Sequence, residues 1–290
     1  MLRIYCEEPY RAMSRTVNDP KLLYLDLLKK SLTRYLAGEI YRPFSRRALR
    51  WLLEVGPVGK LLQSRGIAVM RRCPFDAKAR EEGRDWPSEA ETMIGLQRLD
   101  NLQECIVTVV DDGVPGDLIE TGVWRGGASI FMRAVLKVYG DTSRLVWLAD
   151  SFRGLPKPNA KAYPADSGDC HWQYGELAVS LDTVKSHFQR YGLLDDQVRF
   201  LIGWFSETLP DAPMERLALI RLDGDMYEST MDGLSALYPK LSVGGYLIVD
   251  DYGAIPACRQ AVHDYREQHG INEPIETIDW TGIFWRRAGA

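Results

Sequence analysis

The chain of 290 residues lacks the long apolar runs, cysteine motifs and excess of basic residues that mark several large classes of protein. No apolar run approaches the roughly 18–20 residues needed to cross a bilayer, and the first residues lack the apolar stretch of a signal peptide. Its 5 cysteines form no CxxC motif, which argues against a disulfide framework and against a zinc site. A net charge of -4 gives no overall attraction for nucleic acid. We expect a cytoplasmic protein that binds neither nucleic acid nor membranes.

The sequence also lacks the fingerprints of two common nucleotide-binding folds. It contains no GxGxxG dinucleotide motif and no phosphate loop of the Walker type. A Tyr-x-x-x-Lys pair is missing as well. These absences argue against nicotinamide-dependent oxidoreduction and give no support for phosphate binding.

Helical patterns dominate the first part of the chain. Apolar residues recur every three or four positions in three segments, at 22–39, 46–62 and 88–112. Ser88 followed by Glu91 has the spacing of a capping box and predicts the start of the last of these helices. Residues 41–80 carry ten lysines or arginines against two acids. This basic segment suits a solvated helical face, an oligomer contact or a surface for anionic lipid, and we keep all three interpretations.

After residue 112 the pattern changes to short apolar strands that alternate with helices. The predicted strands are 116–122, 144–152, 197–204, 217–225 and 244–253, and the predicted helices between them are 127–140, 177–192 and 231–241. Such alternation predicts an α/β fold with a doubly wound, mostly parallel sheet that binds ligands at the carboxyl ends of its strands. Residues 273–287 predict one or two antiparallel strands that close the sheet.

A glycine-rich turn follows the first predicted strand. Gly122, Gly126 and Gly127 let the backbone pass close to a ligand, and Glu120 can pair with an ammonium group. Asp150 ends the second strand, where nucleotide-binding sheets place a carboxylate for the ribose hydroxyls. A plain tight turn and an N-cap are the alternatives for these two features.

Two further strands end in pairs of acids. Asp223 and Asp225 follow one strand, and Asp250 and Asp251 follow the next. The carboxyl ends of adjacent parallel strands converge, and four neighbouring carboxylates need a compensating cation to stay ionised. Oxygen ligands of this kind favour a hard cation, Mg²⁺ above all. The alternative is that the acids cap helices and turns.

Several stretches strongly resemble the macrocin O-methyltransferase family. They include ETGVWRGGA, ADSFRGLP, RLDGDMYEST and YPKLSVGGYLIVDDYGAIPACRQAV, and the similarity extends from about residue 84 to residue 287. The resemblance implies a Rossmann-like class I methyltransferase fold that uses S-adenosylmethionine. It implies methylation of a sugar hydroxyl on a glycosylated antibiotic, and assembly into dimers or larger homo-oligomers. Residues 41–80 do not match the compact core of the family.

The resemblance also assigns residues to the cofactor. Those carried over are Glu120, Thr121, Gly122, Asp150, Ser151 and Trp204. Glu120 and Gly122 would lie along the methionine part, and Asp150 would bind the ribose. Ser151 and Trp204 would lie near the nucleoside.

The resemblance assigns Asp223, Asp250 and Asp251 as the ligands of Mg²⁺. Asp225 falls where a general base has been proposed for the family, and His171 matches a histidine beside the acceptor hydroxyl. The catalytic candidates are therefore Asp225, His171 and Asp223. The metal would lower the pKa of the acceptor hydroxyl, and either Asp225 or His171 would receive the proton.

These expectations define a two-part chain. Residues 1–83 would form a helical N-terminal extension or lid, and residues 84–290 the methyltransferase domain. Trp172 lies in a Pro-, Gly- and Asp-rich loop that is a second candidate for a lid over the acceptor. Two alternatives stay open: a metal-dependent O-methyltransferase of a catechol or another vicinal diol, and a non-catalytic S-adenosylmethionine-binding protein. The four clustered acids argue against the latter.

Overall fold

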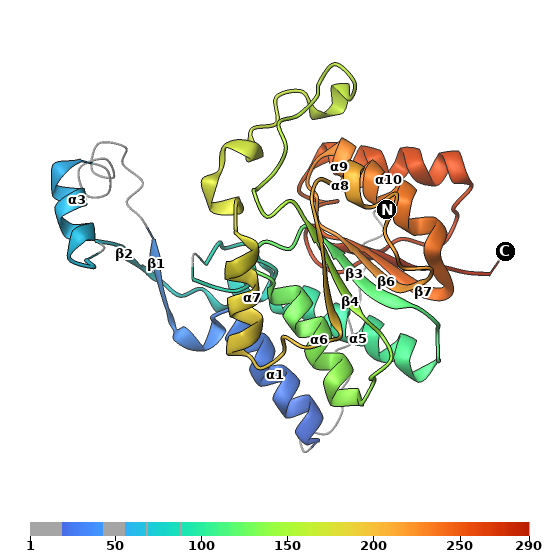
Figure 1. Ribbon diagram of the computed structural model, residues 1–290, viewed down its shortest axis with the longest axis horizontal. Helices are drawn as coiled ribbons and strands as arrows, with labels where there is room; N and C mark the ends of the chain where they lie inside the picture. The colour runs from blue at the N-terminus through green and yellow to red at the C-terminus, as the bar shows by residue number, and fades with distance from the viewer. Residues whose placement is uncertain (1–18, 43–55, 68, 88, 290) are drawn as a thin grey trace, which may run out of the picture.

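A seven-stranded sheet forms the centre of the computed structural model, which describes residues 19–42, 56–67, 69–87 and 89–289 (Figure 1). Its strand order is β5-β4-β3-β6-β7-β9-β8. The strands are β3 (Asp117–Thr121), β4 (Val146–Asp150), β5 (Val198–Ile202), β6 (Leu217–Leu222), β7 (Leu241–Val249), β8 (Glu276–Thr277) and β9 (Ile283–Arg286). The first five run parallel, and β9 pairs antiparallel with both β7 and β8. The predicted mostly parallel sheet and its antiparallel closure are confirmed.

Helices cover both faces of this sheet, as Figure 1 shows. On one face lie α1 (Pro20–Leu32), α5 (Leu96–Asp111), α6 (Gly127–Tyr139) and α7 (Leu181–Arg190), and on the other lie α8 (Phe205–Thr208), α9 (Tyr227–Leu237) and α10 (Pro256–His269). All six residues of β6 are buried, because helices pack on both of its faces. Strand β3 lies between β4 and β6, and the strand order reverses direction at this point. A ligand-binding crevice is expected at such a switch, bordered here by the carboxyl ends of β3 and β6.

The helix predicted from residue 88 begins later than the capping pattern indicated. Ser88 lies outside the described residues, and α5 starts at Leu96 with Gly95 as its N-cap. The backbone of Glu91 is held by other elements: its amide donates to Leu32 O at 3.0 Å, and its carbonyl accepts from Gly127 N at 2.9 Å. Tertiary hydrogen bonds therefore override the local helix signal over residues 89–95.

The N-terminal part contains strands as well as helices. Strand β1 (Glu39–Arg42) pairs antiparallel with β2 (Arg71–Pro74), and α3 (Pro57–Ser64) lies between them in the chain. Figure 1 shows this arm projecting away from the sheet. Part of the predicted helix at 46–62 lies outside the described residues, although its end is confirmed by α3. The prediction of a helical N-terminal extension did not include the β1–β2 pair.

Helix α1 differs from the arm because it belongs to the core of the sheet. Leu25 and Leu32 are fully buried among the side chains of α5 and α6. Lys29 of α1 forms an ion pair with Asp100 of α5. Short α4 (Ala77–Glu81) then leads back from the arm to the sheet. Across the described residues, every helix is too short or too polar to cross a membrane.

Candidate functional site

A cavity of about 250 Å³ opens at the carboxyl ends of the parallel strands. The loops after β3, β4, β5 and β6 contribute its walls, as the strand order predicts. The chain between β4 and α7, residues 152–180, supplies Leu155, Lys157, Asn159 and Leu177 to the same cavity, and we call this segment the lid loop. Six of the residues predicted from sequence line the cavity: Gly122, Asp150, Ser151, Trp204, Asp223 and Asp225.

Gly122 lies where the backbones after β3 and β6 meet. A Cβ atom on this residue would lie 1.6 Å from the carbonyl oxygen of Asp223, and its φ of +82° is a left-handed conformation. Its amide donates to Ala149 O at 2.9 Å. Only glycine fits here. The sequence analysis expected the backbone at Gly122 to lie close to a ligand, and in the structure it lies close to the backbone of Asp223.

Thr121 and Glu120 precede this turn and do not line the cavity. The carbonyl of Thr121 accepts a hydrogen bond from Asp223 N at 2.9 Å, which aligns the ends of β3 and β6. Glu120 is buried, accepts a hydrogen bond from Ser129 Oγ and forms an ion pair with Arg221 at 2.7 Å. Burial raises the pKa of Glu120 to about 7, although Arg221 acts in the opposite direction. Both residues lie behind the wall that Gly122 forms.

Asp150 satisfies both interpretations that its position suggested. It lines the cavity, and it also accepts hydrogen bonds from Val123 N at 2.7 Å and Phe152 N at 2.6 Å. Burial raises the pKa of Asp150, and the backbone amides oppose that rise. The amide of Trp124 and the side chain of Ser151 also hydrogen-bond to this carboxylate. Asp150 therefore holds the turn and lines the cavity at the same time.

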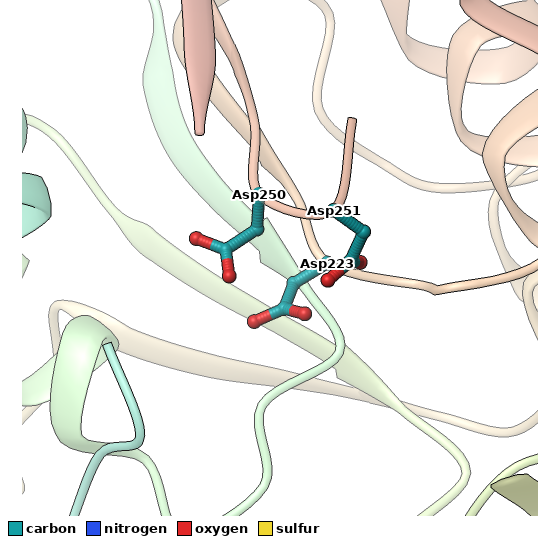
Figure 2. Close-up of side chains that lie close together, drawn as sticks. All are labelled: Asp223, Asp250 and Asp251. Atoms are coloured by element: carbon teal, nitrogen blue, oxygen red, sulfur yellow. The ribbon is translucent and has the colours of Figure 1, made fainter. Parts of the chain in front are cut away.

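Three aspartates come together at the ends of β6 and β7 (Figure 2). Asp223, Asp250 and Asp251 each offer a carboxylate oxygen, and these oxygens lie within 4.8 Å of one another. Asp225 joins the group through its amide, which donates to Asp251 Oδ2 at 3.0 Å. Its φ of +58° is a left-handed conformation that is uncommon for a residue with a side chain.

Burial makes the carboxylates of Asp223, Asp225 and Asp251 resist ionisation. Burial and the nearby Asp250 raise the pKa of Asp223 to about 6, and burial and Asp223 raise that of Asp225 to about 7. Burial and the proximity of Asp225 hold the pKa of Asp251 well above its usual range. A divalent cation would reverse these shifts, because it stabilises the ionised form of every carboxylate around it. The donor set fits Mg²⁺, which prefers carboxylate oxygens.

Two arginines that the sequence analysis missed already bind part of the cluster. Arg98 of α5 and Arg221 of β6 each form an ion pair with Asp250, one on each carboxylate oxygen. Arg221 also contacts Asp223 at 2.9 Å. A charged residue inside the apolar strand LALIRL was the available signal for Arg221, whereas nothing in its own helix distinguishes Arg98. Asp250 is thus the most constrained of the three predicted metal ligands.

His171 lies in the lid loop and does not line the cavity. Its Nδ1 atom lies 2.6 Å from Asp169 Oδ2, and its amide donates to Asp169 Oδ1 at 2.9 Å. Burial and Asp223 are the main causes of the raised pKa of Asp225. In addition, the charge of His171 lowers the pKa of Asp225, and the charge of Asp169 raises it. The pair therefore lies within electrostatic range of Asp225. Asp169 is a third residue that sequence analysis missed, because no motif links it to His171.

With this geometry established, comparisons with known proteins give a consistent result. A family model described as Macrocin-O-methyltransferase (TylF) matches residues 21–287. A Streptomyces olivaceus protein, 8-demethyl-8-(2,3-dimethoxy-alpha-L-rhamnosyl)-tetracenomycin-C 4'-O-methyltransferase, is 55% identical over 94% of this chain and 95% of its own length. Mycinamicin III 3''-O-methyltransferase of Micromonospora griseorubida is 49% identical over 92% of this chain and 96% of its own. The family model includes residues 41–80, which we had expected to lie outside the family core.

The fold comparison agrees with the sequence comparison. The solved structure of the O-methyltransferase NovP has a TM-score of 0.80 and 44% identity, and covers 93% of this chain and 100% of its own. A calicheamicin methyltransferase structure has a TM-score of 0.56 and 19% identity, with coverage of 97% and 98%, and supports the fold alone. The predicted Rossmann-like class I methyltransferase fold is confirmed.

Proposed function

This chain belongs to the macrocin O-methyltransferase family, and from this membership we propose that it transfers the methyl group of S-adenosylmethionine to a sugar hydroxyl of a glycosylated natural product. One observation carries the proposal: a single cavity joins the loop ends suited to a nucleoside with Asp223 and Asp225, and Asp223 also belongs to the three-aspartate cluster suited to a metal. An O-methyltransferase needs these two half-sites side by side, because the methyl group passes directly between the two bound substrates.

The relatives support the choice of acceptor. The Streptomyces olivaceus relative is named for methylation at the 4' position of a rhamnosyl tetracenomycin, and a Streptomyces niveus relative, 44% identical over 96% of this chain and 98% of its own, is a demethyldecarbamoylnovobiocin O-methyltransferase. Both names describe antibiotic scaffolds. The relatives therefore favour a glycosylated acceptor over the catechol or other free vicinal diol that the sequence left open.

The cofactor would occupy the part of the cavity bordered by β3, β4 and β5. Asp150 and Ser151 would bind the ribose, and Trp204 would pack against the nucleoside. Neither Glu120 nor Thr121 lines the cavity, so both would support the cofactor site through the backbone and side chains around Gly122. Tight alignment in this half-site would supply much of the rate enhancement, because the methyl donor is already activated.

Asp223, Asp250 and Asp251 would hold Mg²⁺. When bound, the metal would acidify an acceptor hydroxyl and neutralise the clustered charge. The two arginines on Asp250 would keep that carboxylate oriented, and Arg221 would also orient Asp223.

Either Asp225 or His171 would receive the proton, and separate observations support each candidate. Asp225 lines the cavity and has a pKa of about 7, which suits a base near neutral pH. Binding of the metal beside Asp225 would lower that pKa and make the carboxylate a weaker base. Asp169 engages Nδ1 of His171 and leaves Nε2 to accept the proton. A closed lid loop would bring Nε2 to the acceptor.

Calorimetric titration with S-adenosylhomocysteine, with and without Mg²⁺, tests the two half-sites separately. We expect saturable nucleoside binding by the metal-stripped protein, and Mg²⁺ binding that is lost in the Asp223→Ala/Asp250→Ala double variant. The matched control is Asp196→Ala/Asp211→Ala, which removes two exposed aspartates away from the cavity. Wild type should then methylate a glycosylated macrolide, aminocoumarin or tetracenomycin acceptor.

Failure to bind the nucleoside under either condition would overturn the proposal. Nucleoside binding without transfer to any glycosylated acceptor, but with transfer to a catechol, would favour the rejected alternative. Binding of the nucleoside with no transfer at all would favour a non-catalytic binding protein.

A further inference from the structure

Helix α9 begins directly after the acid cluster and has no N-cap side chain of its own. Its first residue is Tyr227, and the preceding Met226 makes no capping hydrogen bond through its side chain. The first amides of a helix have no partner inside the helix and need one elsewhere. The way in which these amides are satisfied therefore bears on the loop that holds Asp223 and Asp225.

A carboxylate from the lid loop fills this position. Asp166 accepts hydrogen bonds from Tyr227 N at 2.6 Å and from Glu228 N at 3.1 Å, one on each oxygen. It lies 61 residues before Tyr227 and is only 1% exposed. A negative charge at a helix N-terminus is favourable, so this contact can hold the lid loop against α9. The ring of Tyr163 packs beside that of Tyr227, with centroids 6.1 Å apart, and extends the contact.

A continuous chain of hydrogen bonds leads from Asp166 to His171. The carbonyl of Asp166 accepts from Asp169 N at 3.1 Å, and the carboxylate of Asp169 in turn holds the amide and Nδ1 of His171. The N-terminus of α9 thus anchors the turn that carries the histidine. The same N-terminus follows Asp225 by two residues.

We infer that Asp166 is a positioning residue: it anchors the lid loop to α9 and so sets the place of His171 relative to Asp225 and the acceptor hydroxyl. This inference rests on the proposed methyltransferase function. A cap that only stabilised the fold would affect unfolding without affecting the transfer step. A positioning cap would affect transfer far more than unfolding, because an error of about 1 Å in a reacting geometry can cost on the order of 10²-fold in rate.

The experiment compares Asp166→Ala and Asp166→Asn with two cap variants elsewhere. Asp19→Ala removes an aspartate that caps α1 by accepting from Lys21 N, and Asp76→Ala removes an aspartate that caps α4 by accepting from Ala79 N. For each protein we would measure kcat, the acceptor KM, the Kd for S-adenosylhomocysteine and the melting temperature. Hydrogen exchange across residues 160–175 would report the anchoring of the lid loop independently of activity.

We expect Asp166→Ala to lower kcat by about 10²-fold and to speed exchange in residues 160–175, with the nucleoside Kd unchanged. Asp166→Asn keeps one carbonyl acceptor and should fall between Asp166→Ala and wild type, which also covers the case in which Asp166→Ala fails to fold. Asp19→Ala and Asp76→Ala should lower the melting temperature while keeping kcat.

Wild-type kcat in a folded Asp166→Ala, with a melting temperature lowered as in Asp19→Ala, would overturn the inference and leave a structural cap. Unchanged exchange in residues 160–175 would overturn it as well, even if kcat fell. If wild type transferred no methyl group to any acceptor, the proposed function would fail instead, and the exchange measurement would still decide whether Asp166 anchors the lid loop.

Discussion

Arg221 shows how one residue changes the chemistry of the acid cluster. It is almost fully buried in β6 and contacts three carboxylates, those of Glu120, Asp223 and Asp250. A buried ion pair of this kind costs much desolvation energy, and removing one partner leaves an uncompensated charge worth about 3–5 kcal/mol. Arg221 therefore opposes the rise that burial causes in the pKa of Glu120 and in that of Asp223.

Burial also shifts the pKa of an acid at the edge of the cavity. Asp232 lies on α9 at the cavity wall, and burial, together with the nearby Glu228, raises its pKa to about 6. The folded state therefore binds a proton more tightly than the unfolded state does. The contribution of Asp232 to the free energy of unfolding is therefore most favourable below about pH 4, where the carboxyl is protonated in both states. This contribution is lost as the pH rises to about 6.

We therefore predict that Asp232→Asn raises the melting temperature at pH 8 and not at pH 4, because the amide stays neutral at both values. Thermal unfolding measured at the two pH values tests this. The control is Asp211→Asn, which alters an exposed aspartate and should change the melting temperature equally at both. An equal effect of Asp232→Asn at both pH values would contradict the burial argument.

At the scale of elements, helix α1 links the N-terminal part to the sheet. The domain boundary predicted at residue 83 stays a prediction, but α1 shares a hydrophobic core with α5 and α6. The arm formed by β1, α3 and β2 follows α1 and projects from this core (Figure 1). If α1 stabilises the sheet, its buried side chains must contribute to the free energy of unfolding of the whole domain.

We predict that Leu32→Ala lowers the free energy of unfolding by about 2–5 kcal/mol, because Leu32 is fully buried in the core. Leu27 of the same helix is 57% exposed, so Leu27→Ala should stay within about 0.5 kcal/mol of wild type. Urea unfolding followed by fluorescence measures both. Equal and small effects would show that α1 folds apart from the sheet and would support a boundary near residue 83.

At the scale of the whole molecule, assembly remains a prediction from the family resemblance. Apolar side chains are exposed on α1 and on the arm: Leu23 is 50% exposed, Leu27 57% and Leu61 52%. Large exposed apolar side chains on projecting elements favour contacts with other chains. The basic segment at 41–80 includes α3, whose Leu61 is one of these residues.

We predict that the protein is a dimer or larger in solution, with a mass at least twice the 32.9 kDa of one chain. Light scattering after gel filtration measures this directly. Leu27→Glu and Leu61→Glu should lower the mass if α1 or the arm forms the contact, whereas Val243→Glu, at a residue 59% exposed on β7, is the control. A single-chain mass for wild type would contradict the prediction and return the basic segment to its other two interpretations, a solvated face or a lipid-binding surface.

Patterns in the amino-acid sequence were sufficient to predict the order of strands and helices after residue 112 and the acidic residues at the strand ends. Apolar runs of five to nine residues between amphipathic segments allow few alternatives to a doubly wound sheet. Parallel strands bring their carboxyl ends to one edge, so Asp150, Asp223 and Asp250 could be placed near a common crevice from their positions alone. The same argument could not place Glu120 behind the cavity wall or Gly122 against the backbone of Asp223.

The packing of helices and loops determines which distant residues complete the site. Arg98 reaches Asp250 from 152 residues away, and Asp166 reaches α9 from 61 residues away. Local patterns carry no information about such pairs, because contact between them depends on how helices and loops pack after the sheet has formed. For the same reason the capping signal at Glu91 was overruled: its backbone hydrogen bonds to α1 and α6 exist only in the folded protein.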